Sequence, residues 1–186
     1  SKPQPATAFV QPTAFDNLFV LPADPALATI ERELESRYKM FKLRETLDAL
    51  SKDFDRIYID TPPNFNFYSK AALIAADAFL VPFDCDHFSA QAIERLLDNV
   101  MEIKDDHNQA LDFAGVIINQ YNPQAKLPSA LIGELEEKGL PLFDTRLSSS
   151  VKVKESHSAR MPLPFFMPSH KVTKQLMALY EEVEGE

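Results

Sequence analysis

Apolar residues follow two alternating patterns along this chain. Short contiguous apolar runs are typical of strands buried on both faces of a sheet. Apolar residues three or four positions apart are typical of helices that bury one side. The runs predict strands at residues 17–23, 56–60, 79–83, 113–119 and 140–147. The spaced segments predict a helix that begins at Pro25 and helices at residues 39–52, 70–78, 89–104, 128–139 and 169–184.

Local signals at several predicted ends support these helices. Pro25 suits a first helical position, Ser89 is a typical N-cap, and Gly139 suits the position just after a helix. Strands that alternate with helices predict an α/β class: a doubly wound, mostly parallel sheet with helices on both faces. We expect residues 1–16 to form an irregular lead-in and residues 17–186 to form a single α/β domain.

The amino-acid composition narrows the kind of protein further. Cys85 is the only cysteine of the 186 residues, so a disulfide framework is excluded and a cytoplasmic protein is expected. No apolar run reaches the roughly 18 residues of a membrane span, and the N-terminus does not resemble a secretory signal. The four glycines do not form a G-x-x-x-x-G-K-[ST] loop, so the sequence contains no glycine-rich cradle for phosphates.

Asp60 is the first candidate for chemistry. It ends the predicted strand 56–60, and Pro62 and Pro63 prevent that strand from continuing. In open parallel sheets, ligands bind beyond the carboxyl ends of the strands. A carboxylate buried there needs compensation, which a magnesium ion or its water shell provides. A solvated or helix-capping aspartate has the same local sequence. A phospho-acceptor aspartate fits less well, because the acidic pair and lysine that accompany it are not found.

The second candidate is a basic segment in an acidic chain. Residues 146–174 contain six basic residues and one acidic residue, for a formal charge of +5 against −9 for the whole chain. If residues 151–154 are extended, Lys152 and Lys154 point to one side. Such a patch suits the phosphate backbone of a nucleic acid, and it is equally typical of a solvated face. The candidate DNA-binding residues are Lys152, Lys154, Arg160, Lys171 and Lys174.

The order of several motifs resembles one known family. The stretch "DFDRIYIDTPP" is followed by "AAD", by a strand containing Pro82, and then by "CDHF" at residues 85–88. "GVIINQYNP" at residues 115–123 comes next, and then a segment that matches through Ser150, Glu155, Pro162 and Leu163. This ordered set, which covers most of residues 17–184, resembles the ParA/MinD family, the deviant-Walker-A P-loop ATPases of DNA partition and cell positioning, and its ParA/Soj-like branch in particular.

The resemblance implies a function and roles for particular residues. It implies a bacterial, nucleoid-associated ATPase that dimerises with ATP, binds DNA without sequence preference, and hydrolyses Mg-ATP with an activating, ParB-like partner. Asp60 would hold a water of the magnesium ion and act in catalysis, and Thr61, Pro62, Pro63 and Asn64 would form a switch. Asn119 would contact the adenine; the alternative for Asn119 is a turn residue before Asn122-Pro123.

The chain departs from the family in one respect, because the strand, Walker A loop and helix that open the family's fold are absent from these 186 residues. We therefore expect the C-terminal part of a longer protein that does not hydrolyse ATP alone or bind Mg-ATP tightly. One alternative is a MinD-like membrane-associated ATPase, which the acidic end "EEVEGE" disfavours. The other is a non-catalytic remnant that binds a partner protein.

Overall fold

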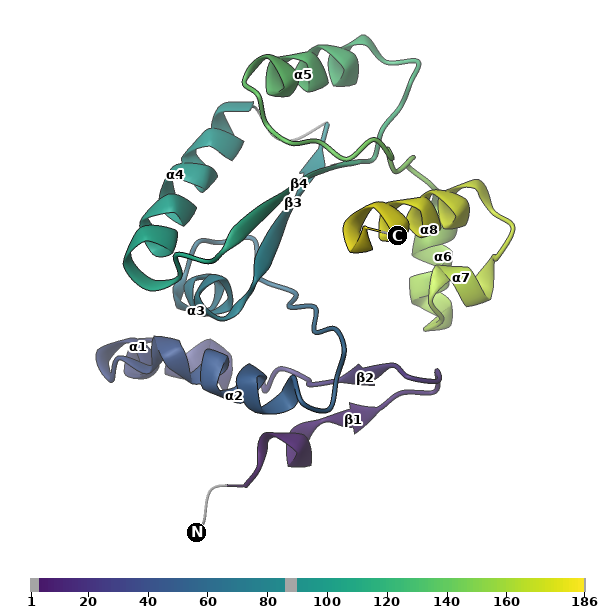
Figure 1. Cartoon of the computed structure of the whole chain (residues 1–186). Coiled ribbons are helices and arrows are strands. Elements are labelled where there is room, and N and C mark those ends of the chain that lie inside the picture. The colour runs from purple at the N-terminus through teal and green to yellow at the C-terminus, as the bar shows by residue number, and fades with distance from the viewer. Residues whose placement is uncertain (1–3, 86–89, 186) are drawn as a thin grey trace. The chain divides into compact units, whose positions relative to one another are not determined.

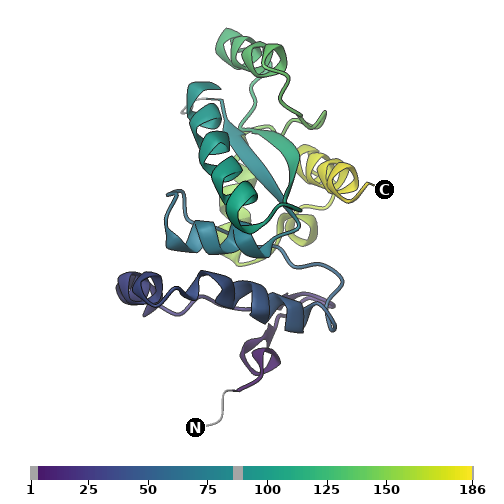
Figure 2. The same cartoon turned by 60° about the vertical axis from the view of Figure 1, so that its left-hand side comes forward.

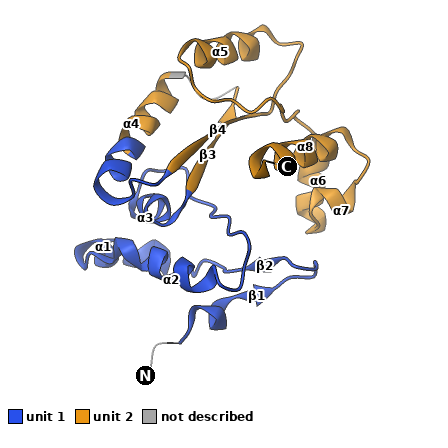
Figure 3. Ribbon diagram, in the orientation of Figure 1, with its two compact units in different colours: residues 1–77, 100–111 blue, residues 78–99, 112–186 orange. Residues whose placement is uncertain are grey.

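The computed structural model describes residues 4–85 and 90–185. Its contacts divide the chain into two compact units, coloured separately in Figure 3. Unit 1 comprises residues 1–77 and 100–111, and unit 2 comprises residues 78–99 and 112–186. Helix α4 (Ala90–His107) runs from the second unit into the first, and Figure 1 labels the elements of both.

Unit 1 is mainly helical. Residues 11–12 and 19–20 pair as a short antiparallel hairpin, so the lead-in and the strand expected at 17–23 meet in one small ladder. The helices lie close to the predicted segments, but the first begins at Leu27, two residues after Pro25, and the helix predicted at 70–78 spans Phe67–Ala75. The Asp24 carboxylate accepts from the Ala26 amide at 2.8 Å. The elements are η1 (Ala6–Phe9), β1 (Gln11–Pro12), β2 (Phe19–Val20), α1 (Leu27–Ser36), η2 (Lys39–Phe41), α2 (Lys42–Leu50) and α3 (Phe67–Ala75).

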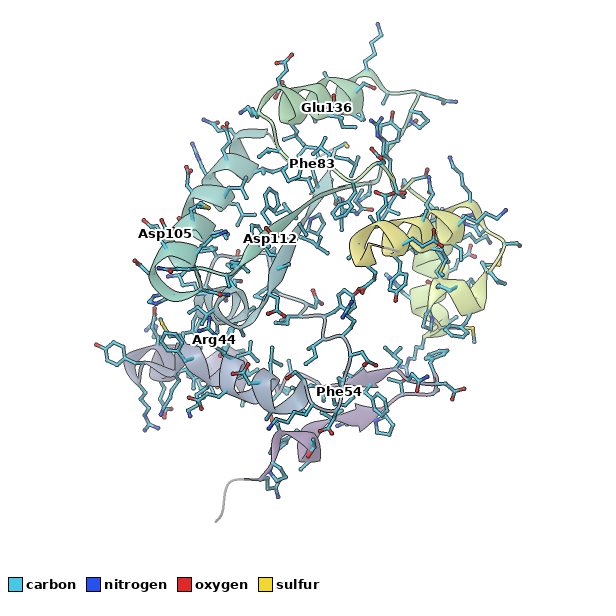
Figure 4. The ribbon with its side chains drawn as sticks, viewed as in Figure 1. Arg44, Phe54, Phe83, Asp105, Asp112 and Glu136 are labelled. Atoms are coloured by element: carbon cyan, nitrogen blue, oxygen red, sulfur yellow. The ribbon has the colours of Figure 1, made fainter. Side chains whose placement is uncertain are left out.

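Two side chains hold the end of α3 in unit 1. Arg44, which Figure 4 labels on α2, donates from its Nε to the carbonyl of Ile74 at 2.7 Å. Its Nη2 donates to the carbonyl of His107 at 3.2 Å. The Nδ2 of Asn108 donates to the carbonyls of Leu73 and Ala76 at 2.9 and 2.8 Å. These bonds satisfy carbonyls that a helix end leaves without intrahelical donors, and they join α2, α3 and the end of α4.

Unit 2 is built on two parallel strands, β3 (Ala78–Asp84) and β4 (Asp112–Asn119), which lie side by side in Figures 1 and 2. Both strands and the parallel character of the sheet were predicted and are confirmed. Residues 140–147, predicted as a strand, follow the other side of β4 through backbone bonds and a parallel bridge from Val116 to Leu142, without forming a continuous strand. The helices of this unit after α4 are α5 (Lys126–Glu137), α6 (Val151–Ala159), α7 (Leu163–Phe166) and α8 (Lys171–Glu184).

The core of unit 2 lies between this sheet and its helices. Phe83, which Figure 4 labels on β3, is buried with 1% of its surface exposed, and Val116 and Ile118 on β4 are buried to the same extent. The strands contribute apolar side chains on both faces, as expected for a parallel sheet covered by helices. Gly139 has φ 70° just after α5, and the Leu140 amide donates to the Leu135 carbonyl at 3.2 Å, so the predicted glycine helix end is confirmed. The buried cluster is Val81, Phe83, Cys85, Ile93, Val116, Ile118, Ile132 and Leu135.

Candidate functional site

The segment that contains Asp60 differs from the prediction. Residues 56–62 form neither helix nor strand, and Asp60 is exposed. Ile57 and Tyr58 are 39% and 63% exposed, so the buried strand expected at 56–60 is wrong for this chain. A strand requires a neighbour that pairs with its backbone groups. Among the residues that the structure describes, the ladders join β1 to β2 and β3 to β4 and do not include 56–60.

The residues expected to form the switch lead into α3. Thr61, Pro62, Pro63 and Asn64 are all exposed. The carbonyl of Asn64 accepts from the Ser69 hydroxyl at 2.7 Å. The segment is thus anchored at its C-terminal end to the first turn of α3.

Asn66 gives that helix a defined beginning. Its Oδ1 accepts from the backbone amides of Tyr68 and Ser69 at 3.1 and 3.2 Å, which is the usual geometry of an asparagine N-cap. Asn66 was not singled out from the sequence, although asparagine is a preferred N-cap residue.

A second polar group lies at the carboxyl ends of β3 and β4. Asp84 and Asn119 are the last residues of the two strands and face each other in register. The Nδ2 of Asn119 donates to Asp84 Oδ1 at 2.7 Å, and the Nε2 of Gln120 donates to Asp84 Oδ2 at 2.9 Å. The structure thus brings Asn119 together with two residues that the sequence reasoning missed. The sequence feature that could have identified Asp84 is its position at the end of an apolar strand, which is the position that was expected for Asp60.

The motif residues that follow Asp84 are only partly described. Cys85 is completely buried in the core of unit 2. Asp86 and Phe88, on which part of the family resemblance rested, and the expected N-cap Ser89 lie outside the described residues.

Three basic residues line one hollow of unit 2, which we call the basic hollow. Arg146 comes from the segment beside β4, and Lys171 and Lys174 are exposed side chains on α8. Lys171 and Lys174 are three residues apart on a helix, so they occupy one face. The structure therefore places two of the five predicted DNA-binding residues together and adds Arg146. The remaining lining residues are Thr145, Gln175 and Ala178.

The other three predicted DNA-binding residues lie on or next to α6. Residues 151–159 are helical, so the extended geometry that would align Lys152 with Lys154 does not occur. At about 100° per residue, the two side chains are directed roughly 200° apart. The ammonium of Lys152 forms an ion pair with Glu155 at 2.7 Å, while Lys154 and Arg160 are exposed. The capping hydroxyl of Ser150, which accepts from the Lys152 amide, favours the helix over the extended form.

The described residues fit only part of a Mg-ATP molecule. They contain no cluster of three or more histidine, cysteine, aspartate or glutamate side chains that would hold a metal ion, and the sequence has no glycine-rich loop for phosphates. One exposed carboxylate, Asp60, does not make a magnesium site without phosphate oxygens. The adenine base of ATP fits the described residues better than the magnesium ion and the phosphates do. Asn119 presents an amide, which can donate and accept hydrogen bonds, at the carboxyl edge of the parallel strands. We therefore assign no hydrolytic step to this chain.

Helices long and apolar enough to cross a bilayer are not found in residues 4–85 and 90–185.

Comparisons with known proteins agree on one group of relatives. A family model described as an AAA domain matches residues 2–113. An uncharacterized protein of Pseudomonas putida is 30% identical over 145 residues, which make up 77% of this chain and 55% of that protein. The chromosome partitioning protein ParA of Myxococcus xanthus is 26% identical over 184 residues, or 97% of this chain and 64% of the relative. The chain thus spans little more than half to about two thirds of these relatives.

A solved structure supports the fold. A substituted form of McdA from Cyanothece, solved as its complex with ATP, superposes with a TM-score of 0.83 and 24% identity, covering 98% of this chain and 72% of that one. At this level of identity the likeness concerns the fold alone. It confirms the α/β class with parallel strands that the alternation of apolar runs and spaced segments predicted.

Proposed function

Because the chain belongs to the ParA/MinD family of P-loop ATPases, we propose that it acts in a ParA-like ATPase of DNA partition or cargo positioning. In this proposal the intact protein forms a homodimer with ATP, binds double-stranded DNA of any sequence at the nucleoid, and is activated by a ParB-like partner. This chain contributes the surface that contacts DNA and the edge that contacts the base of the nucleotide.

The basic hollow is the observation that supports DNA binding. Arg146, Lys171 and Lys174 line one shallow, open part of the surface, although the chain as a whole has a net charge of −9. Clustered cations contact phosphates at any sequence, because the phosphate backbone is the same throughout DNA. Lys154 and Arg160, which are exposed, and Lys152, once released from Glu155, extend the proposed DNA contacts to α6.

The nucleotide roles are proposed for two places in the chain. Asn119 contacts the adenine from the end of β4. Asp60 holds a water of the magnesium ion in the intact protein, and Thr61 to Asn64 respond to the state of the phosphates. Catalysis of phosphoryl transfer rests mainly on positioning and charge neutralisation, so these roles require the phosphate cradle that this sequence lacks.

A salt titration of DNA affinity tests the proposal. Fluorescence anisotropy would be measured for the 186-residue chain with two labelled duplexes of unrelated sequence at several salt concentrations. We expect equal affinity for both duplexes and a strong loss of affinity with salt. Lys171→Glu and Lys174→Glu should each weaken binding and reduce the slope of log affinity against log salt by about one.

Lys126→Glu is the matched control, because Lys126 is exposed on α5 and does not line the basic hollow. It makes the same charge change and should alter binding far less. Equal effects of Lys126→Glu and Lys171→Glu would show that only net charge matters, and binding that is insensitive to Lys171→Glu, Lys174→Glu and Arg160→Glu would overturn the DNA-binding surface.

A further inference from the structure

The Asp84 carboxylate contacts two neighbouring amide side chains at the end of the sheet. Asn119 donates to one of its oxygens at 2.7 Å and Gln120 donates to the other at 2.9 Å. Successive side chains of a strand normally point to opposite faces. Gln120 has φ 53°, in the left-handed region, so the chain turns directly after β4 and both amides reach the same carboxylate.

This contact fixes which way the Asn119 amide points. An ionised carboxylate only accepts hydrogen bonds, so it must face the NH₂ group of the amide and not the carbonyl oxygen. The reverse orientation would set the Oδ1 of Asn119 against a negatively charged oxygen at hydrogen-bond distance. The bond is also charge-assisted, which makes it stronger than a bond between neutral groups. Among the described residues, Asn119 thus presents its Oδ1 and its second N–H away from Asp84.

A fixed amide distinguishes adenine from a 6-oxopurine. Adenine has a donor at its 6-amino group beside an acceptor at N1, whereas guanine and hypoxanthine have an acceptor at O6 beside a donor at N1. The two edges are complementary to opposite orientations of the same asparagine amide. A rotating amide therefore accepts both classes of base equally, and a locked one accepts only one class.

We propose that Asp84 is a positioning residue for base specificity, which makes Asn119 select adenine over 6-oxopurines by preventing its amide from turning. This inference rests on the proposed function, in which Asn119 contacts the base. Asp84 itself does not contact the nucleotide in this proposal. Its role is separate from the phosphate and magnesium contacts, so the test does not require hydrolysis.

The experiment compares two nucleotides that differ only in this edge. The ¹⁵N-labelled chain would be titrated with AMP and with IMP, and the side-chain amide signal of Asn119, assigned by its loss in Asn119→Asp, would be followed by NMR. We expect AMP to shift this signal and to bind about five-fold or more tightly than IMP. In Asp84→Asn, the new amide can both donate and accept, so it no longer fixes the orientation of the Asn119 amide. The ratio of AMP affinity to IMP affinity should then fall to about one.

Gln120→Ala provides the matched control, because it removes the second amide and keeps the bond between Asp84 and Asn119. It should preserve the preference for AMP. Backbone spectra of each variant report whether the fold is intact, and Asp84→Ala replaces Asp84→Asn if the latter does not fold.

The outcomes separate the two proposals. If AMP leaves the Asn119 signal unchanged in the unmodified chain, the proposed base contact and the inference both fail. If AMP shifts the signal but IMP binds as tightly, or if Asp84→Asn and Asp84→Ala keep the full preference, the base contact stands and the role of Asp84 is overturned. The comparison in the unmodified chain tests the inference even without a variant.

Discussion

Arg146 lies over the ring of Tyr121 in unit 2. Its guanidinium carbon is 5.0 Å from the ring centroid, and its Nη1 donates to the phenolic oxygen at 3.2 Å. Tyr121 follows Asn119 by two residues, while Arg146 lines the basic hollow. This contact therefore joins the strand end proposed to contact the base to the surface proposed to contact DNA.

Removal of the Tyr121 ring should destabilise this region. Tyr121→Ala removes a half-buried aromatic side chain and its cation–π contact, and should lower the free energy of unfolding by about 2 kcal/mol. Tyr121→Phe keeps the ring and removes one hydrogen bond, so it should lower the free energy of unfolding by less than about 1 kcal/mol. Urea denaturation of both variants measures the difference. Equal losses would indicate that the phenolic hydrogen bond, and not the ring, makes the contact stable.

Gly115 should not tolerate a side chain. It has φ 145°, and a Cβ atom there would lie 3.0 Å from the Phe143 ring and 3.1 Å from the Pro141 carbonyl oxygen. Gly115→Ala should therefore lower the free energy of unfolding by about 2 kcal/mol, from backbone strain and close contact. Gly133→Ala is the control, since Gly133 lies within α5 with nothing within 4 Å of its added Cβ. Gly133→Ala should raise the free energy of unfolding by about 0.5 kcal/mol. If both substitutions lowered the free energy of unfolding, this account would be contradicted.

Tyr68 should make stability depend on alkaline pH. Burial, followed by the nearby negative charge of Glu31, raises the pKa of Tyr68 above its usual value, and its hydroxyl donates to the Leu27 carbonyl. Both states are protonated below about pH 10, so the stabilisation is complete there. Above that pH the unfolded state loses its proton first, and the stabilisation is lost as the pH rises through the folded-state pKa.

Urea denaturation between about pH 8 and pH 11 measures this effect. Tyr68→Phe should be less stable than the unmodified chain at pH 8, and the difference should shrink as the pH rises. Tyr38→Phe is the control, because Tyr38 is 85% exposed. This substitution should leave the pH dependence of the free energy of unfolding unchanged. A difference that stays constant up to pH 11 would contradict the role of Tyr68.

The chain by itself should not hydrolyse ATP. Asp60 is an exposed carboxylate, and the 186 residues contain no glycine-rich loop to hold the phosphates. Steady-state phosphate release from the purified chain should equal that of a buffer control, with and without double-stranded DNA, and Asp60→Ala should not change it. Hydrolysis that Asp60→Ala abolishes would disprove this prediction.

Several elements could be predicted because their signals are local. Gly139 marks a helix end through its own backbone conformation, and a helix makes its hydrogen bonds within one segment. The apolar runs at 79–83 and 113–119 required burial on both faces, which a parallel pair covered by helices provides. The ordered motifs between residues 54 and 163 led to the family for the same reason, since they are read along the chain.

Contacts between distant segments decided the rest. Residues 56–60 have the sequence of a strand, but a strand exists only when another segment supplies its hydrogen bonds. Lys171 and Lys174 were recognisable as a basic pair, yet their position beside Arg146 depends on how α8 packs along the segment after α5.

The sequence by itself determined the α/β class, most of the helices and the family. Only the tertiary structure joined Asp84 to Asn119, two residues that lie 35 positions apart in the chain. The physical reason is that periodicity and capping act over a few residues, whereas the parallel register of two strands brings their last residues together whatever their separation in sequence.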